Sequence, residues 1–150
     1  YGHDIEGTWL LYEAAEVLRD DKLKEQIRKV GLRMAVATLE EGLDPDGGLI
    51  YEASPEGVTN SDKSWWPQAE AVVGFYNAYQ LSGEEKFREA AFKTWEFIQE
   101  NLADEQDGEW FRRVSREREH YPDDMKVSAW KGPYHNSRMC FEMMERLGRR

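Results

Sequence analysis

The sequence predicts an all-α protein: a partial (α/α) toroid of about five helices arranged as inner and outer helical hairpins. Apolar residues recur at helical spacing along most of the chain. Helices with few charges alternate with helices that carry one heavily charged face, as expected when an inner layer is covered by an outer layer. The sparsely charged helices start about 65 residues apart, which is typical of a helical repeat.

The first two helices show this alternation directly. Residues 4–19 predict a helix whose middle, residues 9–15, is apolar on almost every side, which indicates burial in the inner layer. Residues 22–40 predict a second helix with one apolar stripe and an opposite charged face. The stripe consists of Leu23, Ile27, Val30 and Met34. This second helix is therefore expected in the outer layer.

Residues 42–64 interrupt the helical pattern. Asp46-Gly47-Gly48 is a turn signal, and residues 49–51 are the strand candidate that follows it. Residues 67–81 then predict a third helix, with few charges and with Pro67 suited to its first turn. We expect this helix to belong to the inner layer.

The rest of the chain repeats the same order of elements. Residues 84–102 predict a fourth helix with a charged outer face. Asp107-Gly108 opens a second irregular segment, in which residues 110–114 are a strand candidate. Residues 134–147 predict the fifth helix. Because five helices are too few to close a large ring, we expect a preceding portion of the domain to be absent from this chain.

Composition limits the kinds of partner. The chain has 150 residues and a net charge of −10, which disfavours binding to nucleic acid or to an anionic membrane surface. A neutral small-molecule ligand is compatible with this charge. Cys140 is the only cysteine, so an internal disulfide is excluded, and we expect a cytoplasmic protein. No apolar run approaches the roughly 18 residues of a membrane-spanning helix.

Three unusual segments lie at the starts of the predicted inner helices: residues 2–6, 65–70 and 130–136. In an up-and-down toroid every inner helix starts at the same end. We therefore expect these segments, although far apart in sequence, to meet at one mouth of the ring.

The histidines are the candidates for proton transfer, because a neutral imidazole can accept a proton. His3 lies in a first helical turn, and Glu6 follows at the spacing that places both on one face, within reach to orient the ring. The alternative is a helix cap. His135 follows a Gly-Pro pair, and the alternative there is a solvent-facing turn. His120 lies in a charged loop and is interpreted as surface.

Tryptophans and a second glutamate complete the candidate site. An indole face stacks on a pyranose ring, so Trp65, Trp66 and Trp130 are candidate sugar contacts, with core packing as the alternative. Glu70, one turn after Trp66, bonds either sugar hydroxyls or a partner side chain. Its alternative role is that of a helix-start carboxylate stabilised by the dipole.

A metal site is not expected. His3 and Glu6 have a spacing that occurs in metal sites of helical bundles, but no other histidine or cysteine lies at ligand spacing. The chain also contains no glycine-rich phosphate loop and no CxxC motif.

The stretches GHDIEGTWLLYEAAEVL, WWPQAEAVVGFYNAYQLSG and WKGPYHNSR, in this order and spacing, resemble the C-terminal part of cellobiose 2-epimerases, in the N-acylglucosamine 2-epimerase superfamily. The resemblance covers nearly the whole chain. It implies that residues 1–150 are the C-terminal portion of a single (α/α)6-barrel epimerase domain. It also implies cofactor-free epimerisation at C2 of the reducing-end sugar of cellobiose-type β-1,4 disaccharides, through a cis-enediolate.

The resemblance also assigns roles to residues. It implies two acid–base histidines with a neighbouring glutamate, namely His3, His135 and Glu6. It implies sugar contacts from Trp65 or Trp66, from Trp130 and, with a less defined duty, from Glu70. The family site takes further residues from N-terminal helices that cannot be found here. We therefore expect an incomplete site, inactive alone, whose open edge is covered by the missing N-terminal half of the barrel or by another copy of the chain.

Other activities stay open. An aldose–ketose isomerase shares the enediolate but returns the proton at C1, and an N-acylglucosamine 2-epimerase differs in its sugar. A glycoside hydrolase would need two carboxylates across the sugar, for which Glu6 and Glu70 are available. An inactive sugar-binding fragment is the non-enzymatic alternative.

Overall fold

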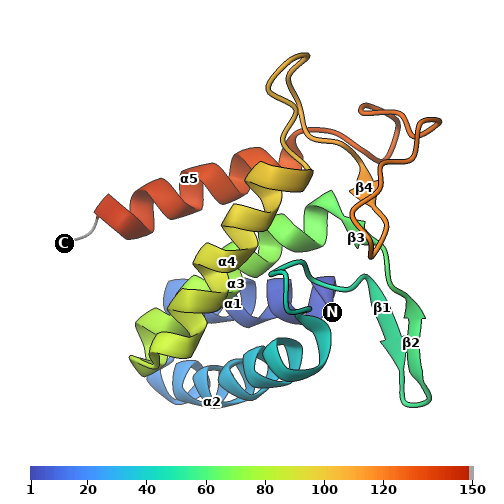
Figure 1. Ribbon diagram of the computed structural model, residues 1–150. Helices are drawn as coiled ribbons and strands as arrows, with labels where there is room; N and C mark the ends of the chain where they lie inside the picture. Colours follow the sequence, from blue (N-terminus) through green and yellow to red (C-terminus); the bar gives the residue numbers. More distant parts are fainter. Residues whose placement is uncertain (149–150) are drawn as a thin grey trace.

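The computed structural model describes residues 1–148 and contains five α-helices within that range. Two antiparallel helical hairpins are followed by a final helix (Figure 1). The helices are α1 (Gly2–Leu18), α2 (Asp21–Ala37), α3 (Trp65–Ser82), α4 (Glu85–Asn101) and α5 (Tyr134–Gly148). The predicted all-α class and the order of the five helices are therefore confirmed.

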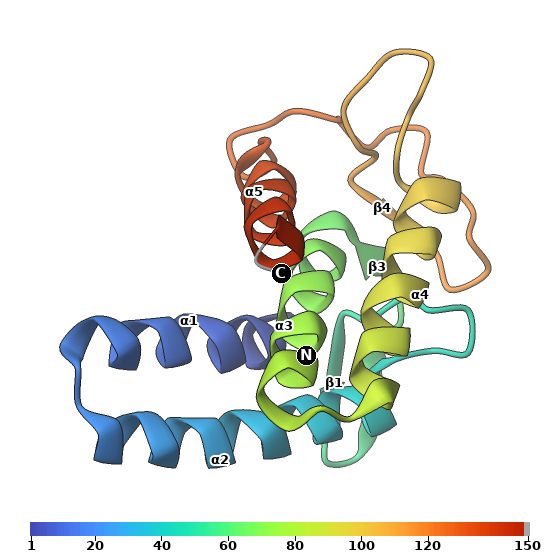
Figure 2. The same cartoon turned by 90° about the vertical axis from the view of Figure 1, so that its left-hand side faces the viewer.

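The helices form two layers, as predicted. α3 packs against both α1 and α5, whereas α2 covers α1 and α4 covers α3. The inner helices are thus α1, α3 and α5, and Figure 2 shows α3 between the other two. In Figure 1 all three start on the side of the molecule that carries the β-strands. Within residues 1–148, no helix combines the length and apolar character needed to cross a membrane.

Short strands line the side where the inner helices start. β1 (Glu52–Ser54) pairs with β2 (Gly57–Asn60), and β3 (Lys63–Ser64) pairs with β4 (Arg113–Val114), both antiparallel. The second pair joins the two irregular segments of the chain. It also fixes the backbone immediately before Trp65, the first residue of α3.

Three local predictions need correction. The second helix does not continue as an α-helix to Glu40, because it widens into a π-turn at Thr38–Gly42. Residues 49–51 do not form a strand, since the strand begins at Glu52 and Leu49 makes only an isolated bridge to Leu43. Only Arg113–Val114 of the predicted strand 110–114 is paired as a strand.

A buried side chain explains why Leu49 needs no strand partner. The Gln68 amide accepts a hydrogen bond from the Leu49 backbone N–H at 2.6 Å and donates one to the Leu49 carbonyl at 2.8 Å. Leu49 itself is fully buried. Its backbone polar groups are therefore satisfied by α3 rather than by a neighbouring strand.

Gly74 allows α1 and α3 to cross closely. A Cβ atom at this position would lie 2.6 Å from Ile5 Cγ1 and 2.7 Å from the Ile5 carbonyl oxygen. Gly7 differs, because a Cβ there would lie 3.8 Å from Met34 Cε, an ordinary contact. The two glycines, both inside helices, therefore form a matched pair for substitution.

Gly74→Ala is expected to lower the free energy of unfolding by about 1–3 kcal/mol, because the added methyl group forces two inner helices apart. Gly7→Ala is expected to raise it by about 0.5 kcal/mol, since alanine has less backbone freedom to lose on folding. Urea denaturation followed by circular dichroism measures both. Equal midpoints for the two variants would show that the α1–α3 crossing tolerates the methyl group.

Candidate active site

A cleft of about 430 Å³ lies at the end of the molecule where the inner helices start. Its walls come from the three segments that the sequence predicts to converge, together with the short strands. The lining residues that belong to those segments are His3, Trp65, Trp66, Trp130 and His135. The structure thus brings together five of the seven candidate site residues in one cleft.

Trp66 contacts both histidines. Its ring centroid is 4.7 Å from that of His3 on α1 and 5.4 Å from that of His135 on α5. The close packing of Trp66 on the start of α1 depends on Gly2, where a Cβ would lie 2.5 Å from Trp66 Cη2. Two imidazoles from helices distant in sequence are therefore held against one indole.

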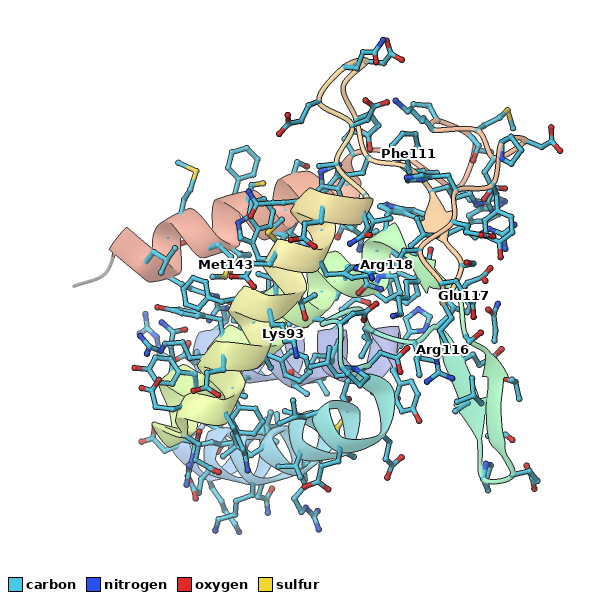
Figure 3. The ribbon with its side chains drawn as sticks, in the orientation of Figure 1. Lys93, Phe111, Arg116, Glu117, Arg118 and Met143 are labelled. Carbon is cyan, nitrogen blue, oxygen red and sulfur yellow. The ribbon has the colours of Figure 1, made fainter. Side chains whose placement is uncertain are left out.

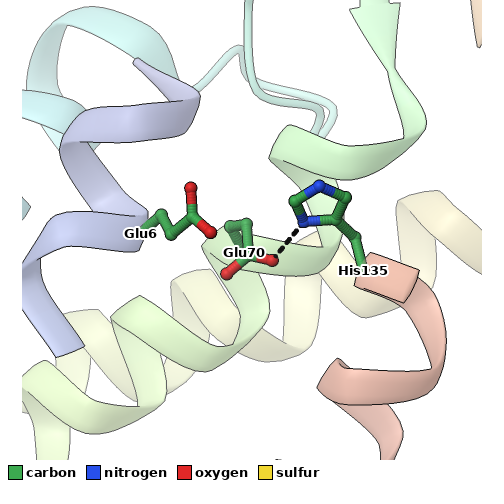
Figure 4. Close-up of side chains that lie close together, drawn as sticks. All are labelled: Glu6, Glu70 and His135. Carbon is green, nitrogen blue, oxygen red and sulfur yellow. Dashed lines mark hydrogen bonds and ion pairs between the residues drawn. The ribbon is translucent and has the colours of Figure 1, made fainter. Parts of the chain in front are cut away.

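The remaining two candidates, Glu6 and Glu70, lie beneath this cluster, and Glu70 binds His135. Glu70 Oε1 is 2.7 Å from His135 Nδ1, and a dashed line marks this contact in Figure 4. Its other oxygen accepts a hydrogen bond from Trp9 Nε1 at 3.1 Å. Because a carboxylate only accepts, His135 Nδ1 is the donor in this contact, and in the neutral imidazole the lone pair is then on Nε2. The Glu70 side chain is 1% exposed, so this arrangement is shielded from water.

Arg138 links the two glutamates. Its Nη2 donates to Glu6 Oε1 at 2.5 Å and to Glu70 Oε1 at 2.6 Å. Burial lowers the pKa of Arg138, but the hydrogen bonds to Glu70 and Glu6 outweigh burial and leave the pKa raised. Arg138 therefore stays positively charged and balances the buried carboxylate of Glu70.

Glu6 has a different neighbour from the one its spacing suggests. The sequence places Glu6 within reach of His3, but the hydrogen bond that the structure gives Glu6 is the one to Arg138. The carboxylate that contacts a histidine is Glu70, which contacts His135. Glu6 is therefore connected to His135 through Arg138 and Glu70.

Glu6, Glu70 and His135 also bring three potential metal-ligand atoms within 4.8 Å of one another. The Arg138 guanidinium already donates to both carboxylates of this group. A metal ion at this position would have to displace the Arg138 guanidinium from both carboxylates, and it would be repelled by the positive charge of that guanidinium nearby. The donor set therefore fits a guanidinium better than a metal ion.

The tryptophans differ in exposure. Trp65 is 6% exposed and packs in the core although it also lines the cleft, whereas Trp66 is partly buried and Trp130 is 89% exposed. Trp9 is buried, as core packing predicts, although its indole N–H also serves Glu70. Of the three candidate tryptophans, Trp66 and Trp130 are thus more open to a ligand than Trp65.

Some lining residues were not singled out from the sequence. Arg113 forms ion pairs with Asp62 and Asp124, and Tyr121 donates to Asp62 at 2.8 Å. Tyr51 presents its edge to Trp66, with ring centroids 6.3 Å apart. The alternation of charged and aromatic residues in both irregular segments was the available signal, but it does not indicate which residues pair.

Layered helical hairpins around a cleft at the helix starts define a protein of the α/α toroid class. Residues 1–138 match the model of the N-acylglucosamine 2-epimerase (GlcNAc 2-epimerase) family. Because the match covers most of the chain, the chain belongs to this family.

Relatives agree with this assignment. The chain is 45% identical to cellobiose 2-epimerase of Bacteroides fragilis over 145 residues, which cover 96% of this chain and 37% of the relative. A sugar epimerase from a ruminal bacterium superposes with a TM-score of 0.92 at 43% identity, over 97% of this chain and 37% of that one. A D-mannose isomerase gives a TM-score of 0.82 at 25% identity, over 96% and 36%.

The chain thus spans little more than a third of the length of the relatives it matches. These structural neighbours are (α/α)6-barrel enzymes, so the prediction of a partial (α/α)6 barrel is confirmed. The inner helices α1, α3 and α5 correspond to part of the inner ring of such a barrel.

Proposed function

We propose that this chain supplies part of the active site of an enzyme that epimerises the reducing-end sugar of cellobiose-type disaccharides at C2. The single observation that carries the proposal is the pair of imidazoles, His3 and His135, placed about Trp66 in one cleft. Inversion at a carbon requires proton transfer on both of its faces. Two histidines from different inner helices are suited to that task.

The proposed reaction starts from the ring-opened aldose. One imidazole takes the C2 proton, whose bonding electrons form the C1–C2 double bond of a cis-enediolate while negative charge develops on O1. Rotation about C2–C3 presents the other face, and the second imidazole returns a proton to C2 as the C1 aldehyde re-forms. The free Nε2 of His135 is the atom suited to transfer, because Nδ1 is bonded to Glu70.

The remaining candidates have supporting roles in this proposal. Glu70 orients the His135 ring, Glu6 and Arg138 hold Glu70 in place, and Trp66 and Trp130 contact the sugar. We further propose that residues 1–150 are the C-terminal portion of one barrel domain, whose other helices complete the site. The single cysteine suits a cytoplasmic enzyme.

The test is isotope incorporation by the full native polypeptide that carries this chain. Incubated with cellobiose in D2O, it is expected to place deuterium at C2 of the reducing sugar and to form the mannose epimer. Proton NMR of the products measures both. Recovery of cellobiose with no deuterium and no epimer refutes the proposal.

Aldose–ketose isomerisation is the second candidate, favoured by the structural similarity to a D-mannose isomerase. It shares proton abstraction at C2 but yields a ketose, so the same NMR spectra separate the two reactions. Hydrolysis is disfavoured, because Arg138 bonds to both Glu6 and Glu70 and occupies the place where a sugar would have to lie between two carboxylates.

A further inference from the structure

Trp130 is an exposed indole next to a completely buried lysine. Its side chain is 89% exposed at the cleft, while Lys131 is 0% exposed. The turn that carries both is closed by a hydrogen bond from the Ser128 N–H to the Lys131 carbonyl at 2.9 Å. A lysine is almost never fully buried unless it is paired, so the burial of Lys131 requires a specific partner.

That partner is Glu109. Lys131 Nζ lies 2.6 Å from Glu109 Oε1, and the same ammonium lies 5.3 Å from the ring centroid of Trp65. Burial raises the pKa of Glu109, but hydrogen bonds from Lys131 and from the Trp110 backbone lower it, and the net pKa is lowered. The ion pair therefore anchors the Trp130 turn to the loop between α4 and β4.

Glu109 also holds the helix that carries His135. The oxygen that binds Lys131 accepts a second hydrogen bond, from Asn136 Nδ2 at 3.1 Å, and Asn136 follows His135 in the first turn of α5. Glu109 adopts φ 59°, in the left-handed region that a residue with a Cβ rarely occupies. A backbone held in this region needs compensating contacts, and the two hydrogen bonds supply them.

We propose that Glu109 and Lys131 are positioning residues, which fix the sugar-stacking indole of Trp130 relative to the imidazole of His135. One carboxylate oxygen, Glu109 Oε1, links the Trp130 turn to the start of α5. It accepts hydrogen bonds from Lys131 in the turn and from Asn136 in the helix. The proposal rests on the proposed function, in which a sugar stacked on Trp130 is deprotonated or protonated by His135. A small displacement of either group lowers the rate, because proton transfer depends on close alignment.

The same loop provides a matched control in Lys126. Its ammonium bonds to Asp104 and to the Gly108 carbonyl, and it is not among the residues that line the cleft. Lys126→Met therefore removes an ion pair from the same irregular segment without removing the link between Trp130 and His135.

The first measurement requires no sugar. The protein is labelled with 5-fluorotryptophan, and a Trp130→Phe variant identifies the Trp130 signal among those of the six tryptophans. In Lys131→Met the Trp130 ¹⁹F resonance is expected to shift and narrow as the indole becomes mobile. The Trp65 resonance is also expected to shift, because its ring lies 5.3 Å from the Lys131 ammonium, and the more distant tryptophans serve as the reference. Lys126→Met is expected to leave the Trp130 resonance unchanged. A Trp130 resonance unaffected by Lys131→Met overturns the proposal.

The second measurement separates positioning from stability, using the full polypeptide and cellobiose. Lys131→Met is expected to lower kcat/KM about 10- to 100-fold. The double variant Lys131→Met/Glu109→Gln removes both charges of the pair, so thermal stability should recover while kcat/KM stays low. Recovery of kcat/KM in the double variant shows that the pair is structural only. If the native protein shows no C2 exchange, the proposed function fails. The fluorine data still show whether the Glu109–Lys131 ion pair holds the Trp130 indole in place.

Discussion

Replacing His135 with asparagine is expected to slow conversion of the reducing-end glucose to mannose by about 10²- to 10⁴-fold, the range associated with loss of a general acid–base group. Asparagine keeps an N–H donor near Glu70 Oε1, which His135 Nδ1 contacts at 2.7 Å in the native protein. The buried carboxylate therefore keeps a partner, and the expected loss is chemical rather than structural. His3→Asn is expected to have an effect of similar size.

The third histidine supplies the control. His120 lies against Phe111, with ring centroids 4.1 Å apart, and is not among the cleft-lining residues. His120→Asn is expected to leave the rate unchanged. The measurement is the appearance of the epimer in proton NMR spectra, with the full polypeptide and cellobiose. Epimerisation at the native rate by both the His3 and His135 variants would remove these residues from the mechanism.

A mechanism with two bases also predicts an asymmetry between the variants. With one histidine replaced, the remaining imidazole can still exchange the proton on its own face of C2. Each variant should therefore incorporate deuterium into one epimer without inverting it, and the two variants should act on opposite epimers. If a single residue served both faces, one variant would lose both exchanges and the other would lose neither.

Sequence reasoning succeeded where a local pattern determines a structure. The alternation between helices with few charges and helices with one charged face predicted which helices are inner, because a helix in the inner ring contacts neighbours on several sides. The same alternation placed His3, Trp66 and His135 at a common end of the molecule. Their convergence in the cleft follows from the regular up-and-down order of the helices.

Hydrogen bonds between residues distant in sequence could not be predicted from the sequence pattern. Arg138 bonds to Glu6 across 132 positions and to Glu70 across 68, and no periodicity encodes such a pairing. Spacing alone suggested that Glu6 orients His3, because neighbours on one helical face are the only contacts that spacing can rank. In the structure α5 supplies a cation, Arg138, which bonds to the Glu6 carboxylate.

The predicted strand positions were wrong for a similar reason. Leu49 and Ile50 are apolar and follow a turn signal, so they resemble a strand, but their burial is achieved in a loop held by Gln68. The π-turn at Thr38–Gly42 was not predicted either, since the apolar spacing of the second helix continues beyond Ala37. In both places the final geometry is set by packing partners far away in sequence.

The largest stability effect is expected at Lys63, which supports the backbone directly before Trp65 and Trp66. Its side chain is 1% exposed, and its ammonium lies 3.1 Å from Asp44 Oδ2 and 2.7 Å from Asp46 Oδ2. Asp44 also pairs with Arg116, which Figure 3 labels on the loop that follows β4. Lys63 thus neutralises two carboxylates and helps to join the two irregular segments that border the cleft.

Lys63→Met is expected to lower the free energy of unfolding by about 3–5 kcal/mol at pH 7, because it leaves buried carboxylates with too little positive charge. Lys86→Met, which removes an exposed lysine paired with Glu84, is expected to cost at most about 1 kcal/mol. Urea denaturation of both variants measures the difference. If Lys63→Met does not fold, Lys63→Met/Asp44→Asn/Asp46→Asn should recover part of the stability.

The cost of Lys63→Met should also depend on pH in a defined direction. Burial raises the pKa of Asp44, but hydrogen bonds from Arg116 and Lys63 outweigh it, so the pKa in the folded protein is lowered. The native stabilisation from Asp44 is therefore present above the unfolded-state pKa of about 3.9 and is lost as the pH falls through the folded-state pKa. Without Lys63 the Asp44 carboxylate takes up a proton at higher pH, which relieves the unpaired charge. The stability difference between variant and native protein should consequently shrink between pH 7 and pH 4, whereas a constant difference would mean that Lys63 acts by packing alone.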